Sequence, residues 1–200
     1  MIKIMVVEDQ ALVRGAVSAL LGLEDNIEVV AEAANGKQAL ELIAQCTPDI
    51  VLTDIEMPIM NGIELIEYLG QNQVNIKTMV MTTFSRAGYI KRALNAGVGG
   101  FILKEAPSSY LIKAINLVVK GKKIIDPELA ISALGDCDPL TSKERKALQL
   151  ASEGLKTADI ASALFLSQGT VRNYLCEAIA KLNATNRIDA ARIAQQKGWL

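Results

Sequence analysis

The chain has no histidine among its 200 residues. This absence excludes catalytic triads that contain histidine and metal sites built from imidazole, and any phosphohistidine step must occur on another protein. Cysteine is scarce as well: Cys46, Cys137 and Cys176 are odd in number and widely spaced. We therefore expect reduced thiols of a cytoplasmic protein and no disulfide framework.

Long hydrophobic runs are also missing, because no apolar stretch of the sequence approaches the roughly 18 residues of a membrane span. The first ten residues, MIKIMVVEDQ, have the pattern of a short strand followed by acids and differ from a signal peptide. We expect a cytoplasmic protein without membrane insertion. Hydrophobic residues make up 50% of the chain, which is enough for a substantial core.

The formal net charge of −1 hides an asymmetry along the chain. Residues 1–138 contain 12 Lys and Arg against 17 Asp and Glu, whereas residues 139–200 contain 9 against 5. An acidic first part and a basic last part indicate two domains with different partners. We predict domains at 1–121 and 139–200, joined by a linker at 122–138.

In residues 1–121 short apolar runs alternate with helical patterns, which predicts an α/β fold with a doubly wound, five-stranded parallel sheet. The predicted strands are Lys3–Val7, Glu28–Ala33, Ile50–Thr53, Thr78–Thr82 and Gly100–Leu103. The predicted helices are Ala11–Leu23, Gly36–Gln45, Asn61–Gly70, Tyr89–Ala96 and Ser108–Lys120. The linker contains one possible helical turn, near Pro127–Leu134.

The pattern from Pro139 onward is helical throughout and predicts a smaller, all-α domain. Thr141 with Glu144 predicts a capping box, and Thr157 and Ser167 are predicted N-caps. The first predicted helix runs to about Ser152, and the others are Ala158–Leu164, Gln168–Leu182 and Arg187–Lys197.

Acidic residues follow two of the predicted strands. Glu8 and Asp9 come after the first strand, and Asp54 comes after the third. Carboxyl ends of neighbouring parallel strands meet at one edge of a sheet, so the three carboxylates are expected to converge. Clustered carboxylates repel unless a cation lies among them, and a set of oxygen ligands favours Mg²⁺. From these residues alone, exposed loop acids at unrelated positions remain the alternative.

Two further strand ends carry a hydroxyl and a cation. Thr82 ends the fourth predicted strand, and Lys104 follows the fifth. A carboxylate, a metal ion, a hydroxyl and an ammonium together are the components of phosphoryl transfer, which depends on positioning and charge neutralisation.

Together with the stretch VLTDIEMPIMNG and the ending GGFILK, these residues resemble the receiver domain of two-component response regulators over residues 1–121. The resemblance implies a flavodoxin-like fold in which Asp54 accepts a phosphoryl group from a sensor histidine kinase. It implies Mg²⁺ held by Asp9, Asp54 and the backbone carbonyl of Glu56, with Glu8 acting through water.

The same resemblance implies that Thr82 and Lys104 bind phosphoryl oxygens and that Phe101 is an aromatic switch residue whose position follows Thr82. One departure is visible, because many receivers have proline directly after the lysine and this chain has Glu105. A cis bond before a residue other than proline costs about 3 kcal/mol, so we predict a trans Lys104–Glu105 bond.

In the basic domain, the second and third predicted helices, counted with their N-caps Thr157 and Ser167, are separated by only two residues, Phe165 and Leu166, which is the spacing of a helix-turn-helix. Polar residues crowd the start of the third helix, where a recognition helix meets the major groove of double-stranded DNA. The alternative is an ordinary bundle helix with a polar solvent face. The candidate DNA-binding residues are Gln168, Thr170, Arg172, Asn173, Cys176 and Lys181.

The stretches PLTSKERKAL, SQGTVRNYL and KLNATNRIDA resemble the LuxR-type tail of the NarL/FixJ family over residues 139–200. The resemblance implies sequence-specific DNA binding and regulated transcription, and within the family it is greatest to a regulator of membrane-lipid desaturation. Arg172 falls where the family has a base-reading lysine. Cys176 is a departure, because a cation is frequent at that position.

The first and fifth predicted helices of the sheet domain have more apolar surface than one buried face requires. Surplus apolar surface marks an interface, so we predict a two-fold dimer through these helices that phosphorylation strengthens. The pattern leaves open which stripe of the first helix faces the sheet, and packing against the chain's own DNA-binding domain is the alternative. The predicted interface residues are Leu12, Ala16, Ala19, Leu23, Ile112 and Val119.

These features predict a phosphorylation-switched, DNA-binding transcription regulator and no enzyme. A receiver that binds DNA without phosphorylation is one alternative. An aspartate-dependent phosphatase of the haloacid dehalogenase kind is another, because Asp54-Ile55-Glu56 faintly resembles its paired acids.

Overall fold

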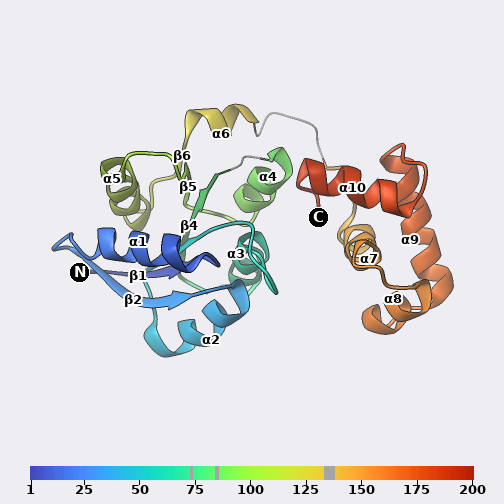
Figure 1. Ribbon diagram of the computed structural model, residues 1–200, viewed down its shortest axis with the longest axis horizontal. Coiled ribbons are helices and arrows are strands. Elements are labelled where there is room, and N and C mark those ends of the chain that lie inside the picture. Colours follow the sequence, from blue (N-terminus) through green and yellow to red (C-terminus); the bar gives the residue numbers. More distant parts are fainter. Residues whose placement is uncertain (73, 84–85, 133–137) are drawn as a thin grey trace. The chain divides into compact units, whose positions relative to one another are not determined.

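The computed structural model describes residues 1–72, 74–83, 86–132 and 138–200. The chain forms two compact units, of which the first contains the sheet and helices α1 to α6 and the second contains helices α7 to α10 (Figure 1). None of the described helices has the length and hydropathy of a membrane span.

The first unit is built on a parallel sheet with the order β2-β1-β3-β4-β5-β6. The strands are β1 (Ile2–Val7), β2 (Ile27–Ala33), β3 (Ile50–Thr53), β4 (Lys77–Thr82), β5 (Gly100–Leu103) and β6 (Ile124–Ile125). The central strands β3 and β4 are buried at every position except Lys77, because helices cover both faces of the sheet. The α/β class and the five longer strands are confirmed, and β6 is a sixth strand that the sequence pattern did not predict.

Two helices cover one face of this sheet and three cover the other (Figure 1). Alternate residues of β1 point to opposite faces, so Ile4 and Val6 pack with the first pair of helices while Met5 and Val7 pack with two of the other three, α2 and α3. The first pair is α1 (Ala11–Leu21) and α5 (Ser108–Val119), and the others are α2 (Gly36–Cys46), α3 (Gly62–Gln71) and α4 (Ala87–Asn95).

The predicted linker contains regular structure that packs on the first unit. Strand β6 pairs with β5, with Ile125 opposite Phe101. It leads into α6 (Pro127–Ser132), where Leu129 is fully buried in the same cluster as Phe101. The helical turn predicted near Pro127 is therefore present, while the end of that prediction, Leu134, lies outside the described residues, as does Cys137.

The second unit is a four-helix domain around a single apolar cluster. Its helices are α7 (Ser142–Ser152), α8 (Thr157–Leu164), α9 (Gln168–Lys181) and α10 (Arg187–Lys197). The capping box of Thr141 with Glu144 and the Ser167 cap are confirmed. The predicted Thr157 cap is wrong: Lys156 occupies the N-cap position with extended backbone angles, and Thr157 is the first helical residue.

Candidate functional site

Three carboxylates lie at the carboxyl-terminal edge of the sheet. Val7 and Thr53, the last residues of β1 and β3, are paired, so Glu8, Asp9 and Asp54 follow adjacent strands. One carboxylate oxygen from each of the three lies within 4.8 Å of the others. The acids therefore converge, as the order of strand ends predicts.

Lys104, directly after β5, joins two of these acids. Its Nζ lies 2.7 Å from Glu8 Oε2 and 2.9 Å from Asp54 Oδ2. The other oxygen of Asp54, Oδ1, accepts a hydrogen bond of 2.7 Å from the backbone N–H of Ile55. Glu8 and Asp54 are buried, whereas Asp9 is exposed. One ammonium thus faces two carboxylates, and the exposed carboxylate of Asp9 adds a further negative charge beside them.

Burial and charge shift the pKa values at this edge in consistent directions. Burial raises the pKa of Glu8, and the nearby Asp54 carboxylate raises it further, against the opposing effect of Lys104. Burial alone lowers the pKa of Lys104, but its bonds to Glu8 and Asp54 outweigh that effect and the net result is a raised pKa. Lys104 therefore stays charged at neutral pH.

The loop after Asp54 holds the backbone of that residue in a narrow space. A Cβ atom on Gly62 would lie 1.8 Å from the Asp54 carbonyl oxygen, so only glycine fits. The Gly62 N–H donates a 3.0 Å bond to the carbonyl of Ile55. Asn61 and Glu64 form a capping box that begins α3 at this point. The turn residues of VLTDIEMPIMNG thus fix the position of Asp54.

The other predicted receiver residues occupy different places along β4 and β5. Thr82 is buried at the end of β4, and its carbonyl accepts a 2.8 Å bond from the Lys104 N–H. Glu56 is exposed two residues after Asp54. Phe101 is fully buried in the sheet, where it pairs with Ile125 of β6 and packs in one cluster with Leu129 of α6. Thr82 therefore belongs to the same edge as the acids, while Phe101 lies deeper in the sheet.

Sequence reasoning assigned no role at this site to Arg14. From α1, its Nη1 donates a 2.6 Å bond to the Glu8 carbonyl, and its Nε lies 3.4 Å from Glu32 Oε2 on β2. The only signal in the sequence is a cation in the thin polar stripe of α1. The predicted trans Lys104–Glu105 bond is confirmed, because the described residues contain no cis peptide bond.

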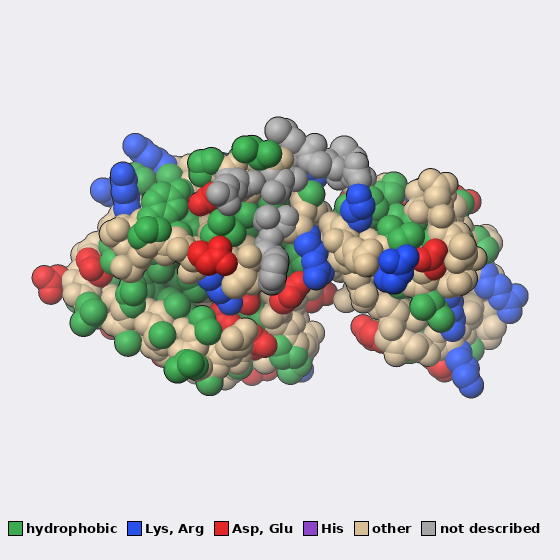
Figure 2. All heavy atoms as spheres, turned by 45° about the horizontal axis from the view of Figure 1, so that its top comes forward, with side chains coloured by type: hydrophobic (Ala, Val, Ile, Leu, Met, Phe, Trp, Pro, Cys, Tyr) green, Lys and Arg blue, Asp and Glu red, His purple; other side chains and the backbone are tan. Residues whose placement is uncertain are grey.

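The second unit contains a helix-turn-helix made by α8 and α9. Val171, Leu175 and Ala178 turn one stripe of α9 into the apolar cluster. The opposite side of the helix faces solvent, and blue Lys and Arg side chains are spread over the visible face of this unit (Figure 2). Of the predicted DNA-binding residues, those exposed are Gln168, Arg172, Asn173, Cys176 and Lys181, and Thr170 is half-buried.

Lys181 differs from the other described candidates because it forms an ion pair with a carboxylate of the unit. Its Nζ donates bonds of 2.8 and 2.7 Å to the two carboxylate oxygens of Glu144. Glu144 is buried and also accepts from the backbone N–H of Thr141. This network links the start of α7 to the end of α9, and it gives Lys181 a structural role that its sequence position did not indicate.

The predicted dimer stripe of α1 faces solvent. Leu12 and Leu23 are 86% and 83% exposed, and Ala16 and Ala19 are exposed between them. The neighbouring stripe packs against the core cluster under α1 and α5. On α5, Ile112 and Val119 are half-buried against that cluster, so only part of each side chain is available to a partner.

Comparison with known proteins identifies the family. A profile of the response regulator receiver domain matches residues 4–116, and one of the bacterial regulatory proteins of the luxR family matches residues 138–194. The chain belongs to the NarL/FixJ family of two-component response regulators. This family consists of transcription regulators.

Relatives of this response regulator match it over its full length. It is 44% identical to the transcriptional regulatory protein YvfU of Bacillus subtilis (strain 168), over 100% of both chains. It is 41% identical to DesR of the same organism, over 100% of this chain and 99% of that one. The response regulator ChrA of a heme-sensing two-component system has a TM-score of 0.58 at 32% identity, over 100% and 98% of the two chains. The names of these relatives do not specify the genes that they regulate, so the link to membrane-lipid genes stays a prediction.

Proposed function

We propose that this response regulator accepts a phosphoryl group on Asp54 from a sensor histidine kinase and then binds DNA as a dimer to regulate transcription. The observation that carries the proposal is the position of Lys104 Nζ, which lies 2.7 Å from Glu8 Oε2 and 2.9 Å from Asp54 Oδ2. In the transfer, an Asp54 carboxylate oxygen forms a bond to phosphorus while the P–N bond of the donor breaks. The Lys104 ammonium offsets the charge of the phosphoryl oxygens.

The acidic edge fits Mg²⁺, because its donor atoms are all oxygens and lie within 4.8 Å of one another. Asp9, Asp54 and the backbone carbonyl of Glu56 would hold the ion, which would neutralise charge on the phosphoryl oxygens. Glu8 Oε2 is already paired with Lys104, which supports an indirect role for Glu8 through water.

The exposed residues at the start of α9 support direct reading of the major groove. Arg172 and Asn173 are both exposed in the first turns of the helix. Arginine pairs bidentately with guanine and asparagine with adenine, so these two residues would read bases. Gln168, Thr170 and Cys176 would lie beside them in the groove.

The exposed stripe of α1 supports the dimer. Leu12 and Leu23 are among the most exposed large apolar residues of the described chain. Leu12 lies on one side of α1 with Ala16 and Ala19, whereas Leu23 follows in the turn, because α1 ends at Leu21 and not at the predicted Leu23. Two such stripes related by a two-fold axis would bury this surface and bring two helix-turn-helix units to adjacent half-sites.

Labelling with acetyl phosphate and Mg²⁺ tests the central step. The wild-type protein should gain one base-labile acyl phosphate, detected as a mass increase of the intact chain, and Asp54→Ala should gain none. Asp25→Ala is the matched control, because Asp25 is an exposed aspartate outside the acidic edge. Undiminished labelling of Asp54→Ala would refute the assignment. Continuous release of inorganic phosphate from acetyl phosphate, without accumulation of the acyl phosphate, would instead favour a phosphatase.

A further inference from the structure

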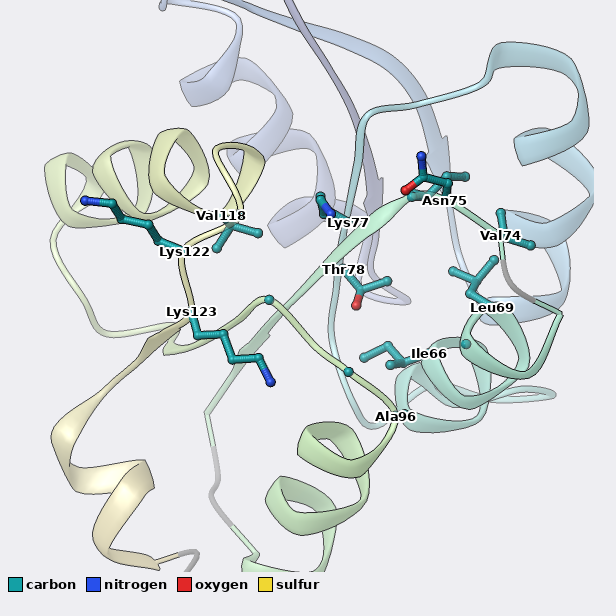
Figure 3. A pocket seen from close by; sticks show the side chains of 15 residues that line it. Ile66, Leu69, Val74, Asn75, Lys77, Thr78, Ala96, Val118, Lys122 and Lys123 are labelled. Carbon is teal, nitrogen blue, oxygen red and sulfur yellow. The ribbon is translucent and has the colours of Figure 1, made fainter.

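A cavity of about 300 Å³ opens at the amino-terminal edge of the sheet, opposite the acidic site (Figure 3). Its walls come from the end of α3, the starts of β4 and β5, the end of α5 and the segment before β6. A volume of this size lies at the lower end of the range for small-molecule sites. Phosphoryl transfer uses the other edge of the sheet and makes no use of this cavity.

Apolar side chains and the hydroxyl of Thr78 line the inner side of the cavity, and Asn75 and glycine backbone add polar surface. Ile66, Leu69 and Val118 are buried in its walls, and Ala96 is half-buried at its side. Thr78, at the start of β4, is 7% exposed, and its side chain has no hydrogen-bond partner among the described residues. Its oxygen points into the space of the cavity (Figure 3). The hydroxyl opens onto the cavity, so a bound group there can form a hydrogen bond with it.

The rim of the cavity carries charge of one sign. Lys77, Lys122 and Lys123 line it, and the described lining contains no Asp or Glu. None of these lysines forms an ion pair with a described residue. Lys123 extends toward the middle of the opening, whereas Lys122 extends away from it (Figure 3). Asp49, which lines the neighbouring cavity, accepts a 2.8 Å bond from the backbone N–H of Lys3.

We propose that this cavity binds a small organic acid with an apolar body. The carboxylate would lie at the rim between Lys77 and Lys123, with one oxygen accepting a hydrogen bond from Thr78. The apolar body would lie against Ile66 and Val118. The lysines favour a negative charge, the hydroxyl donor favours an acceptor, and the side chains of Ile66 and Val118 favour an acid with a hydrocarbon body over acetate. Binding would not require phosphorylation of Asp54.

The NMR signals of glycine backbone amides can report binding to this cavity in the full-length protein. Gly70, Gly97, Gly99 and Gly121 line the cavity, whereas Gly62 lies beside Asp54 at the opposite edge. Titration of ¹⁵N-labelled protein with octanoate should shift the first four amide signals in a saturable way and leave Gly62 unchanged. Acetate tests the need for the apolar body, and octanamide tests the need for the charge. Both should bind more weakly than octanoate.

Substitutions then test the polar contacts. Thr78→Val and the double variant Lys77→Gln/Lys123→Gln should each weaken octanoate binding by at least about tenfold, the loss typical of a hydrogen bond to a charged group. Lys113→Gln/Lys120→Gln is the matched control, because both lysines are exposed on or next to α5 and lie outside the lining. Thr78→Val should leave the melting temperature unchanged or higher, because the hydroxyl has no partner in the protein.

Three results would overturn the assignment. The first is the absence of saturable shifts with octanoate at millimolar concentration in the wild type, which needs no variant to fold. The second is octanoate binding that neither the Thr78 variant nor the lysine variant weakens. The third is a set of shifts confined to Thr47 and Asp49, which would place the acid in the neighbouring cavity of about 560 Å³.

Discussion

Replacing Lys181 with methionine separates a structural role of this residue from contact with DNA. The Lys181 ammonium donates two bonds to Glu144, whose side chain is 7% exposed against 31% for the lysine. Exposed ion pairs contribute about 0–1 kcal/mol, and breaking a buried pair costs about 3–5 kcal/mol. Glu144 keeps its bonds to Thr141, and the lysine is partly solvated. We therefore expect Lys181→Met to lower the free energy of unfolding of the second unit by about 1–3 kcal/mol at neutral pH.

The loss of unfolding free energy in Lys181→Met should depend on pH, because it depends on the charge of Glu144. Burial alone raises the pKa of Glu144, but its bonds to Lys181 and Thr141 outweigh burial and leave the pKa below its ordinary value of 4.5. A carboxyl group whose pKa is lowered by folding contributes stability above its unfolded pKa and loses that contribution as the pH falls through the folded value. The difference between wild type and Lys181→Met should therefore be full at pH 7 and shrink below about pH 4.5.

Urea unfolding followed by tryptophan fluorescence measures this difference. Trp199 is the only tryptophan, and it is buried in the apolar cluster of the second unit. Lys146→Met is the control, because Lys146 is exposed on α7 and forms no ion pair with a described residue. DNA affinity, measured at several salt concentrations, tests the alternative that Lys181 contacts a DNA phosphate. Unchanged stability together with a salt slope reduced by about one would show that Lys181 contacts a phosphate, and would refute the structural role.

The remaining predictions concern the recognition helix, the cover of β5 and the dimer. Arg172→Ala should lose about 1–3 kcal/mol of discrimination at one base pair of each half-site, measured on duplexes varied one position at a time; equal weakening on every sequence would assign Arg172 to a phosphate. Leu129→Ala should destabilise the first unit by about 2–5 kcal/mol in calorimetry, and an unchanged transition would show that α6 adds no stability. Leu12→Lys with Leu23→Lys should keep the protein monomeric in sedimentation when it is loaded with a phosphoryl analogue. A dimer of wild-type strength would exclude the α1 stripe.

Most of the sheet could be predicted because its buried strands are rich in apolar residues. Strands Ile50–Thr53 and Gly100–Leu103 have the predicted bounds, since a strand buried on both faces is a nearly continuous apolar run. Strand β6 could not be found in this way. Its two residues, Ile124 and Ile125, are too few to show a period, and they become a strand only by pairing with the edge of β5.

The acidic site was predictable and its supporting contacts were not, for a related reason. Strand order alone brings Glu8, Asp9 and Asp54 to one edge. By contrast, Arg14 contacts the carbonyl of Glu8 because of the position of α1 on the sheet. Lys181 contacts the carboxylate of Glu144, which is 37 positions away in the sequence. Such partners are decided by tertiary packing, which local patterns do not contain. The stripe of α1 that faces solvent was undecided for the same reason.

The cover over Phe101 constrains how a signal could leave the acidic edge. Ile125 pairs with Phe101, the Asp126 N–H donates a 2.9 Å bond to the Phe101 carbonyl, and Leu129 packs in the same buried cluster. Close-packed interiors have no spare volume, so the Phe101 ring cannot turn outward unless β6 or α6 moves first. Both elements precede the second unit directly in the chain. A switch through Phe101 in this protein would therefore act on the connection to the DNA-binding unit as well as on the surface of the receiver.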